Sequence, residues 1–179
     1  MNNKALFLDR DGIINIDYGH VYMKKDFILV NGIQDLIRTA ISKKYKIIVI
    51  TNQAGIGKGY YTEKDFFKLS EYMKLLLEKS NCYIDKIYFC PYHPTDGIGK
   101  YLQDSFDRKP NPGMLLKAKE DFSLDMNSSI LIGDKVSDVD AGINANVKTN
   151  ILLNQKNNKY DDSKFITINK LREAIQFLS

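Results

Sequence analysis

The chain has 179 residues, 44% of them hydrophobic and 27% charged, a balance typical of a soluble globular protein large enough to bury a core. Its 26 basic and 22 acidic residues leave a net charge of +4 without an arginine-rich run, so the composition does not favour a nucleic-acid-binding protein. The N-terminal residues lack the apolar region of a signal peptide, and no apolar run is long enough to cross a bilayer. We therefore expect a cytoplasmic protein in which Cys82 and Cys90 are reduced thiols.

Short apolar segments rich in β-branched residues alternate along the chain with amphipathic segments. The first kind predicts strands at residues 4–9, 46–52, 85–90, 128–134 and 148–153. The second kind predicts helices at residues 32–44, 62–81, 112–122 and 136–146, with Thr62 as the N-cap of the longest one. A last strand and helix are expected at residues 164–168 and 169–178.

Strands that are apolar on both faces and separated by helices predict a parallel sheet covered on both sides. We therefore expect a single domain over residues 1–179, with an α/β fold built on an open, doubly wound parallel sheet. Residues 10–31 and 91–111 form long irregular segments, which in compact domains are often functional. Because ligands of such sheets bind beyond the carboxyl ends of the strands, the residues that follow each strand are the candidates for a site.

Polar side chains follow each of the first four predicted strands. They are Asp9 and Asp11, then Thr51 and Asn52, then Lys109 at the end of a long loop, and finally Asp134, Lys135 and Asp138. Carboxylates, a hydroxyl and lysines at one edge of one sheet suit phosphoryl transfer. Within this group, Asp138 is expected to orient Lys135 or its loop rather than to bind a metal ion directly.

The chemistry assigns a role to each of the central groups. Asp9 could attack phosphorus and form an aspartyl-phosphate, while Asp11 could protonate the leaving oxygen and then activate water. Asp134 could hold Mg²⁺ together with Asp9 and the carbonyl oxygen of Asp11, because Mg²⁺ prefers oxygen ligands. Thr51 and Lys109 could hold the phosphoryl oxygens as negative charge shifts onto them.

The motifs "DRDG", "TNQ", "RKPNPG" and "GDKVSD" resemble, in this order, the four motifs of the haloacid dehalogenase superfamily. The longer segments "FLDRDGIIN", "VITNQAGIGKG", "CPYHP" and "IGDKVSDVDAGINANV" resemble its heptose 1,7-bisphosphate phosphatase family, a close relative of the histidinol-phosphate phosphatases. The resemblance covers about residues 4–153. It implies a Rossmann-like haloacid dehalogenase fold without a large cap domain, which acts on a small sugar phosphate. With no large cap insertion and no leftover hydrophobic stripe that would demand a partner, we expect a monomer.

The family resemblance also implies an activity and a set of site residues. The activity is Mg²⁺-dependent removal of the C7 phosphate of a heptose 1,7-bisphosphate, on a route to nucleotide-activated heptose for surface polysaccharide. The nucleophile would be Asp9 and the general acid and base Asp11, with the metal ion on Asp9, Asp11 and Asp134. The positions that match phosphate or substrate contacts are Asp17, Tyr18, Gly19, His20, Thr51, Asn52, Gln53, Arg108, Lys109 and Lys135.

The chain departs from the family at a zinc-binding loop. Family members often carry Cys-x-His and, further on, Cys-x-Cys before "RKP", but here Tyr92 and Ser105 stand at two of those positions. His93 is one residue out of register, and Asp107 stands where the last cysteine would be. A structural zinc site needs four ligands, so we expect the zinc site to be lost, with Cys90 as the only matched ligand.

Two other functions are also compatible with the sequence. One is the same chemistry on histidinol phosphate, although a pocket for an imidazole and an amine should be acidic and the pair Arg108 and Lys109 is basic. The other is a phosphate-binding or receiver-like module that is phosphorylated on Asp9 without turnover. Asp11 is the feature that argues against such a module, because a protein that does not hydrolyse its phosphoryl group needs no general acid.

Overall fold

A computed structural model describes residues 3–154 and 163–179 of the chain. In these residues, six parallel strands form one sheet in the order β3-β2-β1-β4-β5-β6. The strands are β1 (Lys4–Leu8), β2 (Tyr45–Asn52), β3 (Lys86–Cys90), β4 (Ile130–Gly133), β5 (Thr149–Leu153) and β6 (Ile166–Ile168). The predicted open parallel sheet is confirmed. Its strand order runs outward in both directions from β1, which places a binding crevice beyond the ends of β1 and β4.

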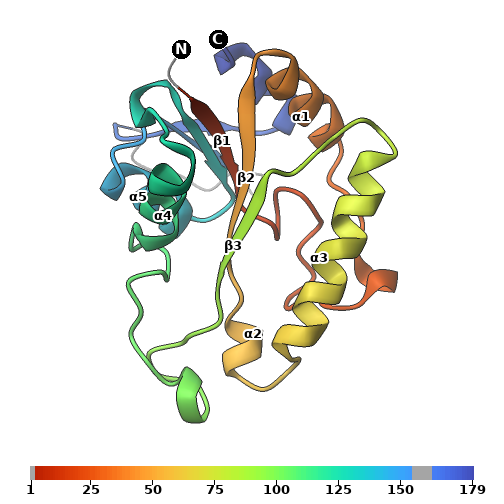
Figure 1. Cartoon of the computed structure of the whole chain (residues 1–179), viewed down its shortest axis with the longest axis vertical. Coiled ribbons are helices and arrows are strands. Elements are labelled where there is room, and N and C mark those ends of the chain that lie inside the picture. The colour runs from red at the N-terminus through yellow and green to blue at the C-terminus, as the bar shows by residue number, and fades with distance from the viewer. Residues whose placement is uncertain (1–2, 155–162) are drawn as a thin grey trace.

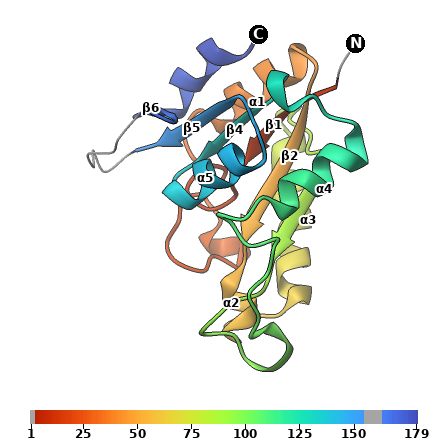
Figure 2. The same cartoon turned by 90° about the vertical axis from the view of Figure 1, so that its left-hand side faces the viewer.

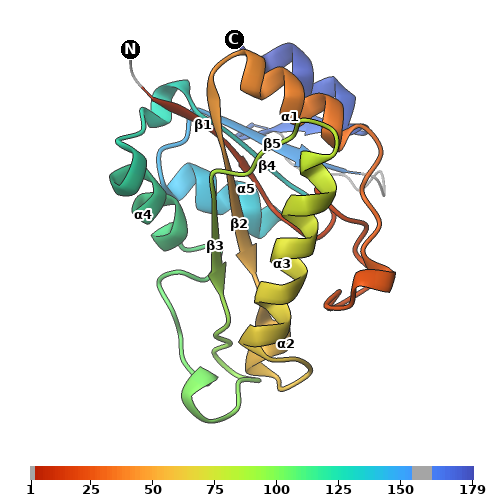
Figure 3. The ribbon, with the colours of Figure 1, turned by 45° about the vertical axis from the view of Figure 1, so that its right-hand side comes forward.

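Helices cover both faces of the sheet. On one face lie α1 (Ile33–Ser42), α3 (Glu63–Glu78) and the 3-10 helix η4 (Leu171–Phe177), as Figures 1 and 3 show. On the other face lie α4 (Gly113–Phe122) and α5 (Val136–Asn144), which come to the front in Figure 2. The described residues also contain four short helices: η1 (Lys24–Asp26), α2 (Ala54–Gly57), η2 (Gly99–Tyr101) and η3 (Met126–Ser128).

Strand β1 shows how one segment contributes to two cores. Leu6 and Leu8 pack into the core beneath α1 and α3, whereas Ala5 and Phe7 pack into the core beneath α4 and α5. All four side chains are fully buried, and burial of each large one contributes roughly 1.5–3 kcal/mol. Because both faces are buried, the strand has a continuous apolar run instead of an alternating one.

Helix α3 begins where the sequence predicts. The Thr62 hydroxyl accepts a hydrogen bond from the Asp65 N–H at 3.2 Å, and the Asp65 carboxylate accepts one from the Thr62 N–H at 3.0 Å. This reciprocal pair satisfies two N–H groups of the helix terminus and is worth about 1 kcal/mol. No helix in the described part of the chain is both long and apolar enough to cross a membrane.

The four short helices were not predicted from the sequence, and the last helix differs from the prediction in type. The last one is a 3-10 helix, in which Leu171 and Ala174 are buried in the core and Ile175 and Phe177 pack against it. Helix α2 was not predicted, because its four residues are too few to show a helical period. Its glycines are packed closely: a Cβ atom on Gly55 would lie 2.3 Å from the Tyr61 ring, and one on Gly57 would lie 2.5 Å from the Pro91 carbonyl oxygen.

Helix α2 is where the long loop of residues 91–111 rests. The Ile98 N–H donates to the Gly57 carbonyl oxygen at 2.8 Å, and Lys58 forms an ion pair with Asp96 at 2.8 Å. Figures 1 and 3 show this loop extending from the end of β3 beside α2 and returning towards α4. Near the end of this loop, Arg108 and Lys109 therefore lie at the carboxyl edge of the sheet.

Candidate active site

A cavity of about 510 Å³ opens at the carboxyl edge of the sheet. Its lining comes from the strand ends and from both long loops: Asp9, Asp11, Asp17, Gly19, His20, Asn52, Gln53, Ala54, Tyr61, Arg108, Lys109, Pro110, Lys135, Ser137 and Asp138. Most of the residues predicted from the sequence are thus brought together. Three of them do not line this cavity: Thr51 is fully buried, Tyr18 is 61% exposed, and Asp134 lines a second cavity that shares Asp17 and Lys135 with the first.

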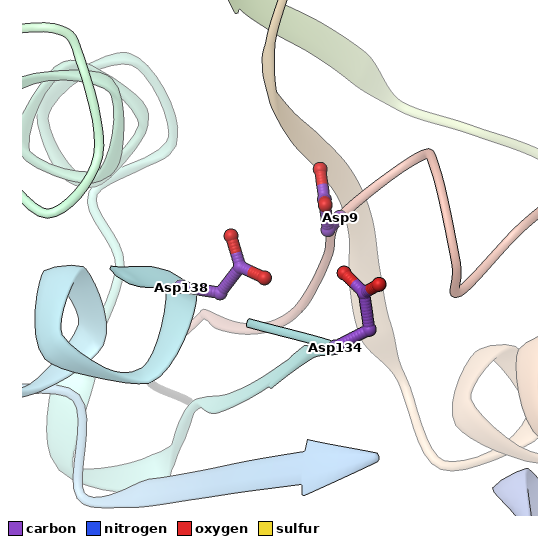
Figure 4. Close-up of side chains that lie close together, drawn as sticks. All are labelled: Asp9, Asp134 and Asp138. Atoms are coloured by element: carbon purple, nitrogen blue, oxygen red, sulfur yellow. The ribbon is translucent and has the colours of Figure 1, made fainter. Parts of the chain in front are cut away.

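Three carboxylates meet at this edge. Asp9 follows β1 and Asp134 follows the adjacent strand β4, while Asp138 lies in the first turn of α5. One carboxylate oxygen of each lies within 4.8 Å of the other two, and Figure 4 shows the three side chains grouped around one space. Glycines make room for them, since a Cβ atom on Gly12 would lie 2.3 Å from Asp134 Oδ2 and one on Gly133 only 2.1 Å from the Asp138 Cβ.

Lys109 is the buried cation of this group. Its Nζ lies 2.9 Å from Asp9 Oδ1 and 2.6 Å from Asp138 Oδ1, and it donates to the Ile50 carbonyl oxygen at 3.0 Å. Although burial acts in the opposite direction, the carboxylates of Asp138 and Asp9 raise the pKa of Lys109, so the ammonium stays charged. Asn52 fixes the backbone of Lys109, because its amide both donates to the Lys109 carbonyl oxygen at 3.0 Å and accepts from the N–H at 3.1 Å.

The positive charge around the carboxylates of Asp9 and Asp134 is too small to offset the effect of burial on their pKa values. Burial raises the pKa of Asp9 to about 7; Lys109 opposes the shift, but the negative charges of Asp138, Asp134 and Asp11 add to it. Burial likewise raises the pKa of Asp134 to about 6, against the opposing effect of Lys135. A further cation bound between these groups would lower both pKa values towards their usual range.

The donor set fits Mg²⁺. Asp134 Oδ1 is buried and has no hydrogen-bond partner among the described residues. Both oxygens of Asp138 are bound by the protein, since Oδ1 faces Lys109 and Oδ2 accepts from the Lys135 N–H at 2.9 Å. Asp9 and Asp134 are therefore the carboxylates best placed to hold a metal ion, and oxygen ligands of this kind are those that Mg²⁺ prefers.

The Asp11 side chain lies apart from the acidic cluster. Arg10 donates to its carboxylate through Nη2, at 2.9 Å to Oδ2 and 3.0 Å to Oδ1, and through Nε at 3.2 Å to Oδ2. Asn15 donates to Oδ1 at 3.0 Å, and Gln53 donates to Oδ2 at 3.0 Å. Since the carboxylate is directed to these donors, the carbonyl oxygen is the atom of Asp11 that we propose as a metal ligand. The sequence did not identify Arg10, Asn15 or Tyr61 as part of the site. No pattern marks them, and only the fold shows that Arg10 is buried at 1% exposure.

The first loop is joined to the other side of the cavity. Lys135 Nζ lies 3.2 Å from Asp17 Oδ2, and the Gly19 N–H donates to Asp17 Oδ1 at 2.8 Å. Burial acts to raise the pKa of Asp17, but these two contacts together lower it, so the carboxylate stays ionised. The ring of His20 packs edge-on against the ring of Tyr60, with centroids 4.8 Å apart.

The positions that correspond to a zinc loop are held by hydrogen bonds. Cys90 is fully buried, and burial raises the pKa of its thiol although the neighbouring Tyr92 and Ser105 act to lower it. The His93 Nδ1 atom accepts hydrogen bonds from the backbone N–H groups of Thr95 at 3.3 Å and Asp96 at 3.0 Å. In the described residues, Asp9, Asp134 and Asp138 are the one group of three or more His, Cys, Asp or Glu side chains close enough to share a metal ion.

Comparison with known sequences adds to this geometry. The Polynucleotide kinase 3 phosphatase family matches residues 6–175. The chain is 47% identical to the D-glycero-alpha-D-manno-heptose-1,7-bisphosphate 7-phosphatase of Burkholderia mallei, over 100% of this chain and 95% of that protein. A protein of the same name from Campylobacter jejuni is 46% identical, over 99% of this chain and 96% of its own.

Solved structures give the same fold. A HAD-like phosphatase from Mesorhizobium loti matches with a TM-score of 0.90 and 32% identity, over 99% of this chain and 85% of the other. A D,D-heptose 1,7-bisphosphate phosphatase from B. bronchiseptica, complexed with magnesium and phosphate, matches with a TM-score of 0.80 and 22% identity. The second match covers 97% of this chain and 96% of the other, and at this identity it shows the fold alone.

Proposed function

Because the chain belongs to the heptose-1,7-bisphosphate 7-phosphatase family of the haloacid dehalogenase superfamily, we propose that it is a magnesium-dependent phosphatase that removes the C7 phosphate of D-glycero-D-manno-heptose 1,7-bisphosphate. The observation that carries this proposal is the meeting of Asp9, Lys109 and Asp134 at one sheet edge, in a chain that matches such enzymes from end to end. We further propose that residues 1–179 are one domain that works as a cytoplasmic monomer, without nucleic acid or membrane partners, in heptose synthesis for surface polysaccharide.

The residues support a reaction in two halves. An oxygen of Asp9 attacks the C7 phosphorus, the bond from phosphorus to the sugar oxygen breaks, and Asp11 gives that oxygen its proton. Water then attacks the aspartyl-phosphate, Asp11 takes the proton from the water, and inorganic phosphate leaves with Asp9 restored. The backbone N–H of Arg10 and the ammonium of Lys109 both contact Asp9 Oδ1, so Asp9 Oδ2 accepts a hydrogen bond from neither of them.

Positive and polar groups hold the phosphoryl group during this reaction. Lys109 and the hydroxyl of Thr51 stabilise its oxygens as charge shifts onto them, a contribution that in such sites is often the largest single one. Magnesium, held by Asp9, Asp134 and the carbonyl oxygen of Asp11, would supply further neutralisation of this charge when bound. Asp138 orients Lys109 and the start of α5, as its hydrogen bonds indicate.

The remaining lining residues suit the sugar and its second phosphate. Arg108 lines the cavity and donates through Nη1 to the Tyr92 carbonyl oxygen at 3.2 Å, which aims its guanidinium from the loop of residues 91–111. A guanidinium can bind a phosphate through two parallel hydrogen bonds. Substrate contacts are also proposed for Asp17, Tyr18, Gly19, His20, Asn52 and Lys135. Gln53 has both amide hydrogens committed to protein groups, so we propose no substrate contact through its amide nitrogen.

The choice between sugar and histidinol substrates follows from the charge of this cavity. We expect kcat/KM for the α- or β-anomer of heptose 1,7-bisphosphate to exceed that for histidinol phosphate by at least about 100-fold, because a site built for polar contacts rejects a ligand that leaves them unpaired. Phosphate release measured with Mg²⁺ under identical conditions gives the ratio. A ratio in favour of histidinol phosphate would contradict the proposed substrate, and a stable aspartyl-phosphate without release would indicate a receiver-like module.

We also propose that the loop of residues 91–111 needs no zinc. The buried Cys90 thiol, with its raised pKa, is a poor source of the thiolate that zinc requires, and a Ser105 hydroxyl is a poor ligand. We expect only trace zinc in metal analysis of protein purified without chelators, and full activity after zinc chelation once Mg²⁺ is restored. The variant Cys90→Ser should keep its fold and activity. Stoichiometric zinc that Cys90→Ser loses would contradict the proposal.

A further inference from the structure

Gln53 lies between two groups of the proposed reaction. Its side-chain Nε2 donates to Asp11 Oδ2 at 3.0 Å and to Thr51 Oγ1 at 2.8 Å. Both hydrogens of the amide nitrogen are therefore in use, one on the proposed general acid and one on the proposed phosphoryl-binding hydroxyl. Because Thr51 Oγ1 accepts from Gln53 and donates to no residue in the described part of the chain, its hydroxyl hydrogen is available to the proposed phosphoryl group.

The Gln53 amide can donate both of these hydrogen bonds in only one of its two orientations. If the Gln53 amide turned over, its oxygen would face the Asp11 carboxylate, and two acceptors would oppose each other. The Tyr61 hydroxyl favours the observed orientation, since it donates to Gln53 Oε1 at 2.6 Å. A tyrosine O–H at this position stabilises the orientation in which the nitrogen faces Asp11 and Thr51.

The Tyr61 ring is itself fixed on both sides. It is stacked on Tyr22, with ring centroids 5.1 Å apart and planes 7° apart. Its edge lies against Gly55, where a Cβ atom would come within 2.3 Å of Tyr61 Cε1. The side chain is only 6% exposed, and burial raises the pKa of Tyr61 to about 12, so its hydroxyl remains a donor at any pH at which the protein works.

Gln53 and the other partners of Asp11 come from different parts of the chain. Arg10 and Asn15 reach the carboxylate from the segment that follows β1, and Gln53 reaches it from the end of β2. The Gln53 backbone is anchored too, because its N–H donates to the Cys90 carbonyl oxygen at 2.8 Å. The Asp11 carboxylate is thus held from two sides, and Gln53 is the partner that accepts a hydrogen bond from Tyr61.

We propose that Tyr61 and Gln53 form a positioning pair: Tyr61 fixes the orientation of the Gln53 amide, and Gln53 in turn aims Asp11 at the leaving oxygen and Thr51 at the phosphoryl group. This proposal rests on the function proposed above, in which Asp11 is the general acid. Neither residue of the pair touches the reacting atoms. Their effect on the reaction is exerted through Asp11 and Thr51.

The test separates the two halves of this arrangement by the leaving group. A sugar alkoxide needs a proton from Asp11 to leave, whereas p-nitrophenolate, the anion of a much stronger acid, does not. We define the first-turnover ratio as the rate constant with heptose 1,7-bisphosphate divided by that with p-nitrophenyl phosphate, both measured before the phosphoenzyme is hydrolysed. Disturbance of Thr51 slows both substrates and largely cancels in the ratio, so a fall in the ratio reports on Asp11.

We expect Tyr61→Phe to lower the first-turnover ratio about tenfold, the effect of losing one well-placed hydrogen bond in the chain that leads to Asp11. Gln53→Met, which keeps the volume and removes the amide, should lower the ratio at least as much and serves if Tyr61→Phe folds poorly. The matched control is Tyr22→Phe, which keeps the stacked ring pair, lies outside the Asp11 contacts and should leave the ratio unchanged.

Asp11→Asn provides the reference for the proposed function. If the ratio falls in Asp11→Asn but neither Tyr61→Phe nor Gln53→Met differs from the Tyr22→Phe control, the positioning pair is refuted and the acid role of Asp11 stands. If Asp11→Asn itself leaves the ratio unchanged, the acid role fails, and the positioning proposal fails with it. Equal slowing of both substrates in Tyr61→Phe and Gln53→Met would also overturn the proposal, because it would show no effect through Asp11.

Discussion

Replacing Asp9 by asparagine is expected to lower kcat by more than about 1,000-fold, because the carboxamide cannot form the aspartyl-phosphate on which the proposed reaction depends. Asp9 is 5% exposed at the end of β1, so the substitution changes one oxygen to nitrogen in a confined place and leaves its volume almost unchanged. The measurement is phosphate release from heptose 1,7-bisphosphate with saturating Mg²⁺. The exposed Asp26→Asn, in η1, is the matched control and should keep full activity.

The stability of the same variant distinguishes lost chemistry from lost structure. The pKa of Asp9 is raised to about 7, which means that the folded protein favours the neutral carboxyl group. Stability contributed by the neutral form is therefore lost as the pH rises from about 4 through 7, and the neutral amide of Asp9→Asn does not lose it. At pH 8 without Mg²⁺, we expect the Tm of Asp9→Asn to equal or exceed that of the wild-type protein. Full activity in Asp9→Asn would contradict the nucleophile assignment.

Replacing Lys109 by methionine should impair both activity and stability. The ammonium is 4% exposed and lies between Asp9 and Asp138, so its removal leaves two buried carboxylates without their cation. Breaking a buried ion pair in this way costs about 3–5 kcal/mol, and loss of a donor to the phosphoryl group costs about 100- to 1,000-fold in kcat. Thermal or denaturant unfolding gives the first quantity, and steady-state kinetics gives the second.

The control for Lys109→Met is Lys46→Met. Lys46 also forms an ion pair with an aspartate, Asp85 at 2.8 Å, but its side chain is 44% exposed and far from the cavity lining. An exposed pair of this kind contributes only about 0–1 kcal/mol, so Lys46→Met should be nearly neutral. If Lys109→Met proved as mild as Lys46→Met, the buried lysine would have neither the structural nor the catalytic part assigned to it.

Much of the fold follows from the sequence because its signals are local. The apolar run of β1, the helical period of α1 and the capping residue Thr62 all act over short distances, and each predicts an element that the structure contains. The elements that differ have physical reasons. The short helices, such as the four residues of α2, have too few residues to show a period. The apolar positions of η4 and its C-cap, Leu171, Ala174, Ile175 and Leu178, also suit an α-helix, so their pattern does not identify the 3-10 turn.

Only part of the candidate site can be predicted from the sequence. Positions at strand ends mark Asp9 and Asp134, because parallel strands end at one edge of the sheet. The sequence cannot show which carboxylate a buried side chain faces, so it does not reveal that Arg10 grips Asp11 or that Tyr61 reaches Gln53. Those contacts depend on the path of loops whose residues carry no repeating pattern.

The most direct test of the proposed function follows heptose 1,7-bisphosphate by ³¹P NMR in the presence of the enzyme and Mg²⁺. The proposed 7-phosphatase predicts that the C7 phosphate signal is replaced by that of inorganic phosphate while the anomeric C1 phosphate signal remains. Chelation of Mg²⁺ should stop the change, and its return should restore it. Loss of the C1 signal first, or no change in either signal with Mg²⁺ present, would contradict the account.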